Sequence, residues 1–379
     1  MPPNLLISCS VVVFVTCISM VGAQRSSDYF VYIGSYTNTT SKGIYVSDFD
    51  SRSGSLSSPR LVAEAVFPAQ LWAEPNGRFL YAANWQGSET AAGDTISAYA
   101  IEKSTGALTF LNKVTCGGSG PNQVVVDPGG TIAVAVNYRS GSVAAFGLES
   151  DGRISEPFYI DQHEGQPQPP STQPGPRAHG VVFSSDSRFV YVADIGLDRV
   201  YSYRLDAARR VMTPLEPPYV PQPAGSGPRR LQLHPNGKFL YLNRETDSRV
   251  TVFAVDNGRL DEMQSLPTLP DGFTDSNTTA EILIDAPGRF LYVSNRGHGS
   301  IAVYAIDGGG RLTLVEHAVS GGRIPRNFSL DPTGQYLLSS NQDTENIVVL
   351  RIDPATGRLA PAGVQVPLAN PGSLAFVKR

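Results

Sequence analysis

The stretch GSGPRRLQLHPNGKFLYLNRE (225–245) contains two short apolar runs separated by a Pro-Asn-Gly turn. Pro presets a negative φ and Asn or Gly tolerates a positive one, so this turn predicts two antiparallel strands that meet there. The second run, an apolar strand ending in polar residues, has seven versions along the chain. They are FVYIGSY (30–36), FLYAANW (79–85), IAVAVNY (132–138), FVYVADI (189–195), FLYLNRE (239–245), FLYVSNR (290–296) and YLLSSNQ (336–342).

Each of these strands lies in the same local context. A partner strand precedes six of them, as in QVVVD (123–127), and an alternating strand follows all seven, as in GSIAVYAI (299–306). A Gly-containing turn and a weaker fourth strand come next, as at 310–312. The repeat is therefore a four-stranded antiparallel meander of about 50 residues.

The two ends of the chain complete one repeat together. The first repeat lacks its opening strand, while PGSLAFV (371–377) is an opening strand with nothing after it. A sheet of this size cannot bury both faces alone, so the repeats must stack, and closing a ring removes the unpaired end units. We expect an all-β, seven-bladed β-propeller over residues 24–379, closed by the C-terminal strand joining the N-terminal strands. The alternative, an open β-solenoid, leaves the split repeat unexplained.

The composition excludes several classes of protein. Of the 379 residues 41% are hydrophobic and 17% are charged, which argues against a disordered chain or a coiled coil. The 30 basic and 34 acidic residues give a net charge of −4, with no basic stripe to neutralise a phosphate backbone. We therefore expect no nucleic-acid partner.

Residues 1–23 read as an export signal. An apolar segment from Leu5 to Val21 ends in the small-residue pattern Val21-Gly22-Ala23. We expect a cleaved signal peptide, an exported protein in the periplasm or outside the cell, and no stable membrane insertion after cleavage. An uncleaved anchor is the alternative. Cleavage would leave Cys116 as the only cysteine, which excludes an intrachain disulfide and favours a packing role.

Polar and charged residues recur where the first strand of a repeat begins and where the second ends. Antiparallel pairing places both positions at one edge of each sheet, so all of them should surround one mouth of the ring. Such charges are costly to bury unless they are paired or used, so they form either a site or inter-blade ties. The first-strand positions are Arg177, His179, Arg229, Arg230, Glu281, Arg326 and Asn327. The second-strand positions are Asn84, Trp85, Asn137, Tyr138, Asp194, Arg244, Glu245, Asn295, Arg296, Asn341 and Gln342.

Among the five histidines, His179 is the best acid–base candidate because it has arginines and Glu245 as expected neighbours. His298 lies in a loop at the mouth, where it binds substrate or stabilises the loop. His234 is in a turn and His317 in an outer strand, where solvent contact is expected. His163 lies in an insertion, 157–175, that is either a lid or disordered.

Common enzyme motifs are missing: the chain has no GxSxG elbow, HExxH, phosphate loop or dinucleotide fingerprint. We expect no cofactor and no metal. The segments 175–200, 225–245, 280–304 and 325–342 instead resemble the lactonase family of seven-bladed propellers, which includes bacterial 6-phosphogluconolactonase and fungal 3-carboxy-cis,cis-muconate cyclase. Two positions depart from the family pattern, which often has His where this chain has Gln123 and Arg230.

The resemblance implies a site at the central mouth that acts on a small-molecule lactone or carboxylate. It implies that His179 or Glu245 activates water while Arg229 and Arg296 hold substrate anions and stabilise the oxyanion. The expected substrate-binding residues are Arg177, Asp194, Glu281, His298, Arg326, Asn327 and Gln342. The favoured activity is hydrolysis of a sugar lactone. The alternatives are a carboxymuconate-type lactonising cyclase and a non-catalytic propeller that binds a ligand or a protein.

Overall fold

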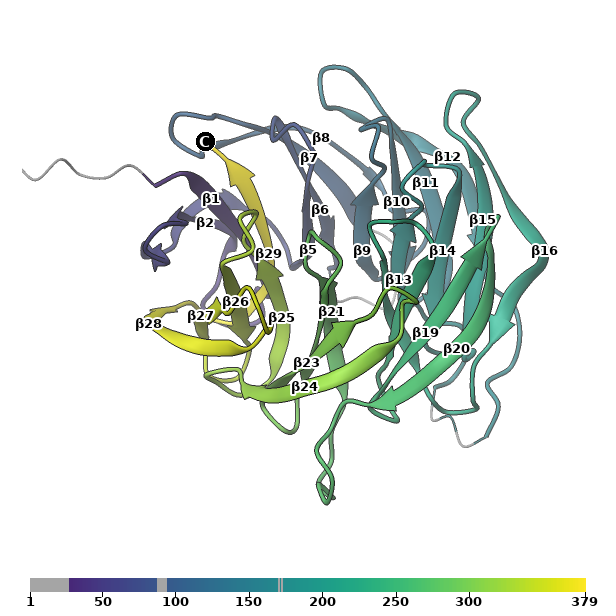
Figure 1. The fold of residues 1–379 in the computed structure, drawn as a ribbon. Helices are drawn as coiled ribbons and strands as arrows, with labels where there is room; N and C mark the ends of the chain where they lie inside the picture. The colour runs from purple at the N-terminus through teal and green to yellow at the C-terminus, as the bar shows by residue number, and fades with distance from the viewer. Residues whose placement is uncertain (1–26, 87–93, 170, 172) are drawn as a thin grey trace, which may run out of the picture.

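The computed structural model describes residues 27–86, 94–169, 171 and 173–379, which form seven antiparallel sheets and no helix (Figure 1). The sheets are the blades of a closed ring, as the repeats predicted. Each blade runs from an inner strand near the ring's middle to an outer strand at its periphery. The predicted signal peptide lies outside the described residues. Within the described part of the chain, no helix is long and apolar enough to cross a membrane.

The blades are numbered 1 to 7 in chain order. Their inner strands are β29 (Pro371–Lys378), β5 (Pro68–Ala73), β9 (Pro121–Val126), β13 (Ala178–Phe183), β17 (Pro228–Leu233), β21 (Thr279–Ile284) and β25 (Pro325–Leu330). The second strands are β1 (Tyr29–Ser35), β6 (Phe79–Asn84), β10 (Ile132–Asn137), β14 (Phe189–Asp194), β18 (Phe239–Arg244), β22 (Phe290–Asn295) and β26 (Tyr336–Asn341). The third strands are β2 (Gly43–Asp50), β7 (Thr95–Ile101), β11 (Ser142–Leu148), β15 (Arg199–Asp206), β19 (Arg249–Asp256), β23 (Ser300–Ile306) and β27 (Asn346–Ile352). The outer strands are β3 (Ser55–Leu56) with β4 (Arg60–Glu64), β8 (Leu108–Thr115), β12 (Ile154–Gln162), β16 (Val211–Pro221), β20 (Arg259–Pro267), β24 (Leu312–Val319) and β28 (Leu359–Pro367).

The two ends of the chain close the ring in blade 1. Strand β29 pairs antiparallel with β1, with Tyr32 opposite Ala375. The backbone N–H of Arg379 also donates to the carbonyl of Asp28 at 3.1 Å. The predicted closure is confirmed.

The recurring Phe-Leu-Tyr sequence is explained by packing between neighbouring blades. In blade 5 the buried Tyr241 hydroxyl donates to the carbonyl of Gly310 in blade 6 at 2.9 Å. Gly310 has a φ of 79°, and a Cβ there would lie 2.4 Å from the Phe239 ring. Tyr292 and Phe290 contact Gly357 of blade 7 in the same way. The same hydroxyl-to-carbonyl bond joins Tyr32 to Gly106 and Tyr81 to Gly152, so in blades 1, 2, 5 and 6 the motif joins a blade to a turn of the next.

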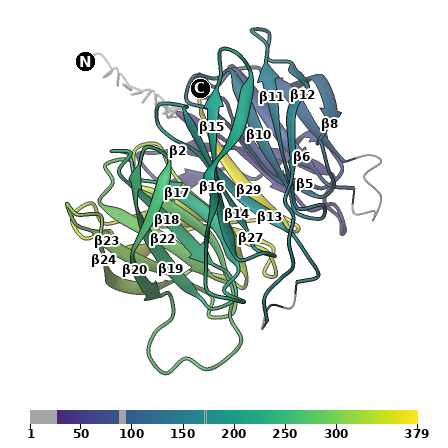
Figure 2. The same ribbon diagram turned by 90° about the vertical axis from the view of Figure 1, so that its right-hand side faces the viewer.

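The mouth of the ring lies where inner strands begin and second strands end, as in the pairing of Pro228 with Arg244. The segment 268–278 leads into the inner strand β21 at this edge and projects beyond the blades (Figure 2). The insertion expected at 157–175 is shorter than predicted, because 157–162 belong to β12 and pair with β11.

Candidate active site

Two successive positions of each inner strand carry the polar residues of the mouth. The first of these positions holds Ala69, Asn122, His179, Arg229, Ala280, Arg326 and Gly372 around the ring. The second holds Gln70, Gln123, Gly180, Arg230, Glu281, Asn327 and Ser373. Because the seven strands are equivalent, these residues form two adjacent rings around the axis.

Four residues of the second ring tie neighbouring blades together. Each accepts a hydrogen bond from a backbone N–H of the next inner strand: Gln70 from Val124 at 3.1 Å, Gln123 from Val181 at 2.9 Å, Asn327 from Leu374 at 3.2 Å and Ser373 from Leu71 at 2.9 Å. Blades 4 to 6 carry Gly180, Arg230 and Glu281 instead. Glycine and arginine have no side-chain acceptor. The belt of ties is therefore interrupted where the charged residues gather.

Glu245 is shared by two arginines. Its Oε2 accepts from Arg229 Nε at 2.6 Å, and its Oε1 accepts from Arg296 Nη2 at 2.9 Å. Arg229 is held by a further bond to the carbonyl of Ala280, and Arg296 by one to Thr279 at 3.2 Å. The Glu245 and Arg296 side chains are 21% and 16% exposed, so this pair is the accessible part of the cluster.

The electrostatic surroundings keep both Glu245 and Arg229 charged. Burial raises the pKa of Glu245, but the Arg229 and Arg296 guanidinium groups more than offset it, and the net pKa is lowered. Burial lowers the pKa of Arg229 to about 9, with Glu245 opposing the change. At neutral pH the cluster thus holds a carboxylate between two cations.

His179 is buried in the same cluster and is neutral. Asn122 Nδ2 lies 3.0 Å from His179 Nδ1 and 3.4 Å from its Nε2, and it donates to the His179 carbonyl at 3.0 Å. Burial, and then Arg229 and Arg230, hold the pKa of His179 well below its ordinary value. His179 therefore presents a neutral imidazole.

A small cavity lies at the axis between the arginines. It is lined by Tyr36, Ala69, Asn122, Arg229, Arg230, Arg326, Asn327, Gly372 and Ser373. About 10 Å³ is available to the centre of a water molecule, so the cavity holds roughly one water. Arg326 Nε donates to the Tyr36 hydroxyl at 2.6 Å. A sugar ring does not fit in this space.

A larger hollow adjoins the cluster between blades 6 and 7. Its volume is about 770 Å³, which is within the usual size range of small-molecule sites. Arg296, His298, Arg326 and Gln342 line it, so four residues expected at the mouth face one space. Arg296 belongs both to this hollow and to the Glu245 ion pair, and it connects the two.

The other predicted site residues, His179, Arg229 and Glu245 included, are not among the described residues that line this hollow. Glu281 is buried and accepts from Asn327 Nδ2 at 2.6 Å. Arg177 lies over the Tyr138 ring, with its guanidinium carbon 5.6 Å from the ring centroid. Asp194 is fully buried, and its Oδ1 accepts from the backbone N–H groups of 177, 196 and 197 at 2.8–3.0 Å. The structure therefore brings His179, Arg229, Glu245 and Arg296 together, and it places Asp194 within the framework of blade 4.

Three residues that sequence reasoning did not assign contribute to this region. His163 is buried and contacts Asp194 Oδ2 at 2.6 Å and the Tyr203 hydroxyl at 2.9 Å. Asn122 orients His179, and Tyr36 orients Arg326. Tyr36 ends the second strand of the first repeat, the position equivalent to Trp85 and Tyr138, so the repeat did carry a signal for it.

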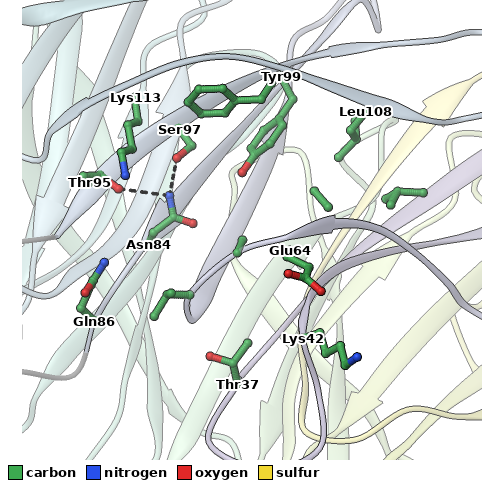
Figure 3. Close-up of a pocket in the computed structure, with 15 residues that line it drawn as sticks. Thr37, Lys42, Glu64, Asn84, Gln86, Thr95, Ser97, Tyr99, Leu108 and Lys113 are labelled. Atoms are coloured by element: carbon green, nitrogen blue, oxygen red, sulfur yellow. Dashed lines mark hydrogen bonds between the residues drawn. The ribbon is translucent and has the colours of Figure 1, made fainter.

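Another hollow, of about 810 Å³, lies between blades 1 and 2 (Figure 3). In its wall Asn84 Nδ2 donates to Ser97 at 2.7 Å and to Thr95 at 3.4 Å. No arginine or histidine is among the described residues that line it. Lys42, Glu64 and Lys113 line it, but it does not contain the arginine–glutamate cluster of the mouth.

Comparison with known proteins gives concordant results. Residues 30–376 match the family model described as "Lactonase, 7-bladed beta-propeller". A 6-phosphogluconolactonase of Bacillus subtilis is 35% identical over 89% of this chain and 96% of its own. A 6-phosphogluconolactonase of Formosa agariphila is 31% identical over 87% and 94%. The periplasmic gluconolactonase of Pseudomonas aeruginosa superposes with a TM-score of 0.86 at 30% identity, over 93% and 99%.

Proposed function

Because the chain belongs to the lactonase family of seven-bladed β-propellers, we propose that it hydrolyses a sugar lactone at the mouth of the ring. The observation that carries this proposal is the Glu245 carboxylate held between Arg229 and Arg296, beside a hollow of suitable size. A carboxylate and adjacent cations are the groups that ester hydrolysis by water requires. The relatives named above are lactonases, which favours hydrolysis over cyclisation and over a purely binding role.

In the proposed reaction the lactone occupies the hollow with its carbonyl near Arg296. Glu245 accepts a proton from a water molecule as the water oxygen bonds to the carbonyl carbon. The carbonyl electron pair moves to oxygen, where the Arg296 guanidinium, which lines the hollow, donates a hydrogen bond to it. Collapse of this intermediate breaks the bond to the ring oxygen, which receives the proton from Glu245. The product is an open-chain hydroxy acid.

His179 has a separate role in this scheme. Its neutral imidazole has one ring N–H, which donates a hydrogen bond to a substrate oxygen. His179 is 4% exposed, whereas the Glu245 side chain is 21% exposed and can be reached by water. This difference in access favours Glu245, of the two residues expected to activate water, as the general base.

We also propose that the protein acts after export, on a lactone available outside the cytoplasm. The apolar N-terminal segment supports this, as does the periplasmic location of the Pseudomonas aeruginosa relative. Mass spectrometry of the protein recovered from its native host should find a mature chain that begins at Gln24. An intact chain beginning at Met1 would contradict cleavage.

The activity is tested with purified mature protein and a panel of substrates: glucono-δ-lactone, 6-phosphogluconolactone and a muconolactone. Hydrolysis is followed by proton release, with spontaneous ring opening subtracted. We expect acceleration with at least one sugar lactone. A folded protein that accelerates none of the three would overturn the proposal, and turnover of the muconolactone alone would favour the cyclase alternative.

A further inference from the structure

The strongest feature that this mechanism leaves unused is the guanidinium of Arg230. The residue is 6% exposed, and neither its Nε nor its Nη1 has a hydrogen-bond partner. Its backbone N–H donates to Asn243 Oδ1 at 2.9 Å, which fixes the start of its side chain. Buried charged donors without acceptors are strongly unfavourable, so this group calls for a ligand.

The surroundings of Arg230 carry an excess of positive charge. Arg229, Arg230, Arg296 and Arg326 lie in one electrostatic cluster with His179, and the carboxylates near them are Glu245 and Glu281. Glu245 is already shared by two arginines. Glu281 accepts from Asn327 at 2.6 Å and from the Ile282 N–H at 3.1 Å. Neither acid compensates Arg230 through a hydrogen bond.

The cavity that Arg230 lines is too small for the anionic group of a substrate. Three arginines and no acidic residue line it, so its wall is cationic. Its room for roughly one water excludes a carboxylate or a phosphate group. A monoatomic anion has about the volume of a water molecule and supplies the charge that water lacks.

We propose that the axial cavity is a chloride site, in which the Arg230 guanidinium holds one buried halide ion together with Arg229 and Arg326. The ion offsets the uncompensated charge where the belt of inter-blade ties is interrupted. It is a structural ligand that stabilises the closed ring. The proposal concerns folding and does not depend on which lactone the protein hydrolyses.

The test measures thermal unfolding of the full mature chain against chloride concentration. Sodium chloride is compared with sodium methanesulfonate at equal ionic strength, because methanesulfonate is too large for the cavity. A ligand that binds only the folded state raises the melting temperature as its concentration rises. We expect chloride to raise it by about 2 °C or more beyond methanesulfonate.

Two variants locate the effect. Arg230→Gln should abolish the chloride-specific rise. Arg209→Gln removes the same charge from a side chain that is 82% exposed, and it should retain the rise. A rise that persists in Arg230→Gln, or no rise in the wild type, would overturn the proposal.

Crystallography gives an independent measurement should Arg230→Gln fail to fold. Wild-type crystals grown in sodium bromide should show an anomalous peak in the axial cavity, within hydrogen-bond distance of the Arg230 guanidinium. A water molecule there with no anomalous signal, or bromide only at exposed sites, would overturn the proposal.

Discussion

At the scale of the residue, the chemistry of the mouth depends on one carboxylate that serves two cations. Glu245 neutralises part of the charge of Arg229 and Arg296, and it is the most exposed member of this trio. A pair of buried guanidinium groups without it would repel each other. Glu245 therefore affects both the stability of the cluster and the proposed reaction.

Glu245→Gln should lower kcat/KM for the best lactone by about 10²–10⁴, because an amide cannot accept the proton of the attacking water. The measurement is proton release under subsaturating substrate. Glu316→Gln is the matched control, since Glu316 pairs with Arg358 at 3.0 Å on the outer strand β24. It should retain wild-type turnover. A folded Glu245→Gln protein with wild-type kcat/KM would refute the assigned role.

The pH profile should lack the inflection of an ordinary histidine. The pKa of His179 is held well below 6.5, so this side chain gains no proton as the pH falls through 6.5. The pKa of Glu245 is also lowered, so the base remains ionised until the medium is clearly acidic. We expect kcat/KM to be flat from about pH 5.5 to 8 and to fall below that range. A fall in kcat/KM centred near pH 6.5 would contradict this prediction, because it would indicate that His179 has the pKa of an exposed histidine.

At the scale of the element, the residue that follows β12 is joined to β14 and β15 by a buried polar network. His163 bonds to both Asp194 and Tyr203, and it stacks on Tyr201 with ring centroids 3.7 Å apart. This network anchors the end of β12 to blade 4, and it occupies Asp194 Oδ2.

Asp194→Asn should therefore reduce the free energy of unfolding by about 2 kcal/mol or more, since it weakens several charge-assisted hydrogen bonds. Urea denaturation measures this loss, and KM of the remaining folded enzyme should not change. Asp206→Asn, at a partly exposed site in the same blade, should leave both quantities near wild type. A raised KM with unchanged stability would restore the substrate-binding role that the sequence suggested for Asp194.

These elements also show what the sequence could and could not predict. The strand order, the closure and the convergence of His179, Arg229, Glu245 and Arg296 followed from the repeat, because equivalent positions of equivalent strands occupy one edge. The contact of His163 with Asp194 could not be predicted in this way. His163 lies in an insertion, so it has no equivalent residue in the other repeats from which its location could be inferred. The size of the axial cavity depends on packing of seven strand ends, which no single segment encodes.

At the scale of the whole molecule, the ring depends on β29. Its Leu374, Ala375 and Val377 are buried, and Ser373 accepts a hydrogen bond from Leu71 of blade 2. Without β29, the edge of β1 is unpaired. Blade 1 then has no inner strand to contact the inner strands of blades 7 and 2.

Deletion of residues 371–379 should abolish the cooperative thermal transition and expose the chain to limited proteolysis, because the closed ring cannot form. Calorimetry and trypsin digestion measure the two effects. Deletion of Arg379 alone should leave the transition within a few degrees of wild type, since Arg379 is exposed at the ring's edge. A truncated chain that still melts cooperatively would show that the blades are stable without closure.

Closure by the final strand also sets the timing of the protein's biogenesis. Gly372 and Ser373, which line the axial cavity, are synthesised after all the other residues that line it. Until β29 has left the ribosome and paired with β1, the arginines at the mouth cannot acquire their final surroundings. The mouth is thus completed only after the other six blades have been synthesised.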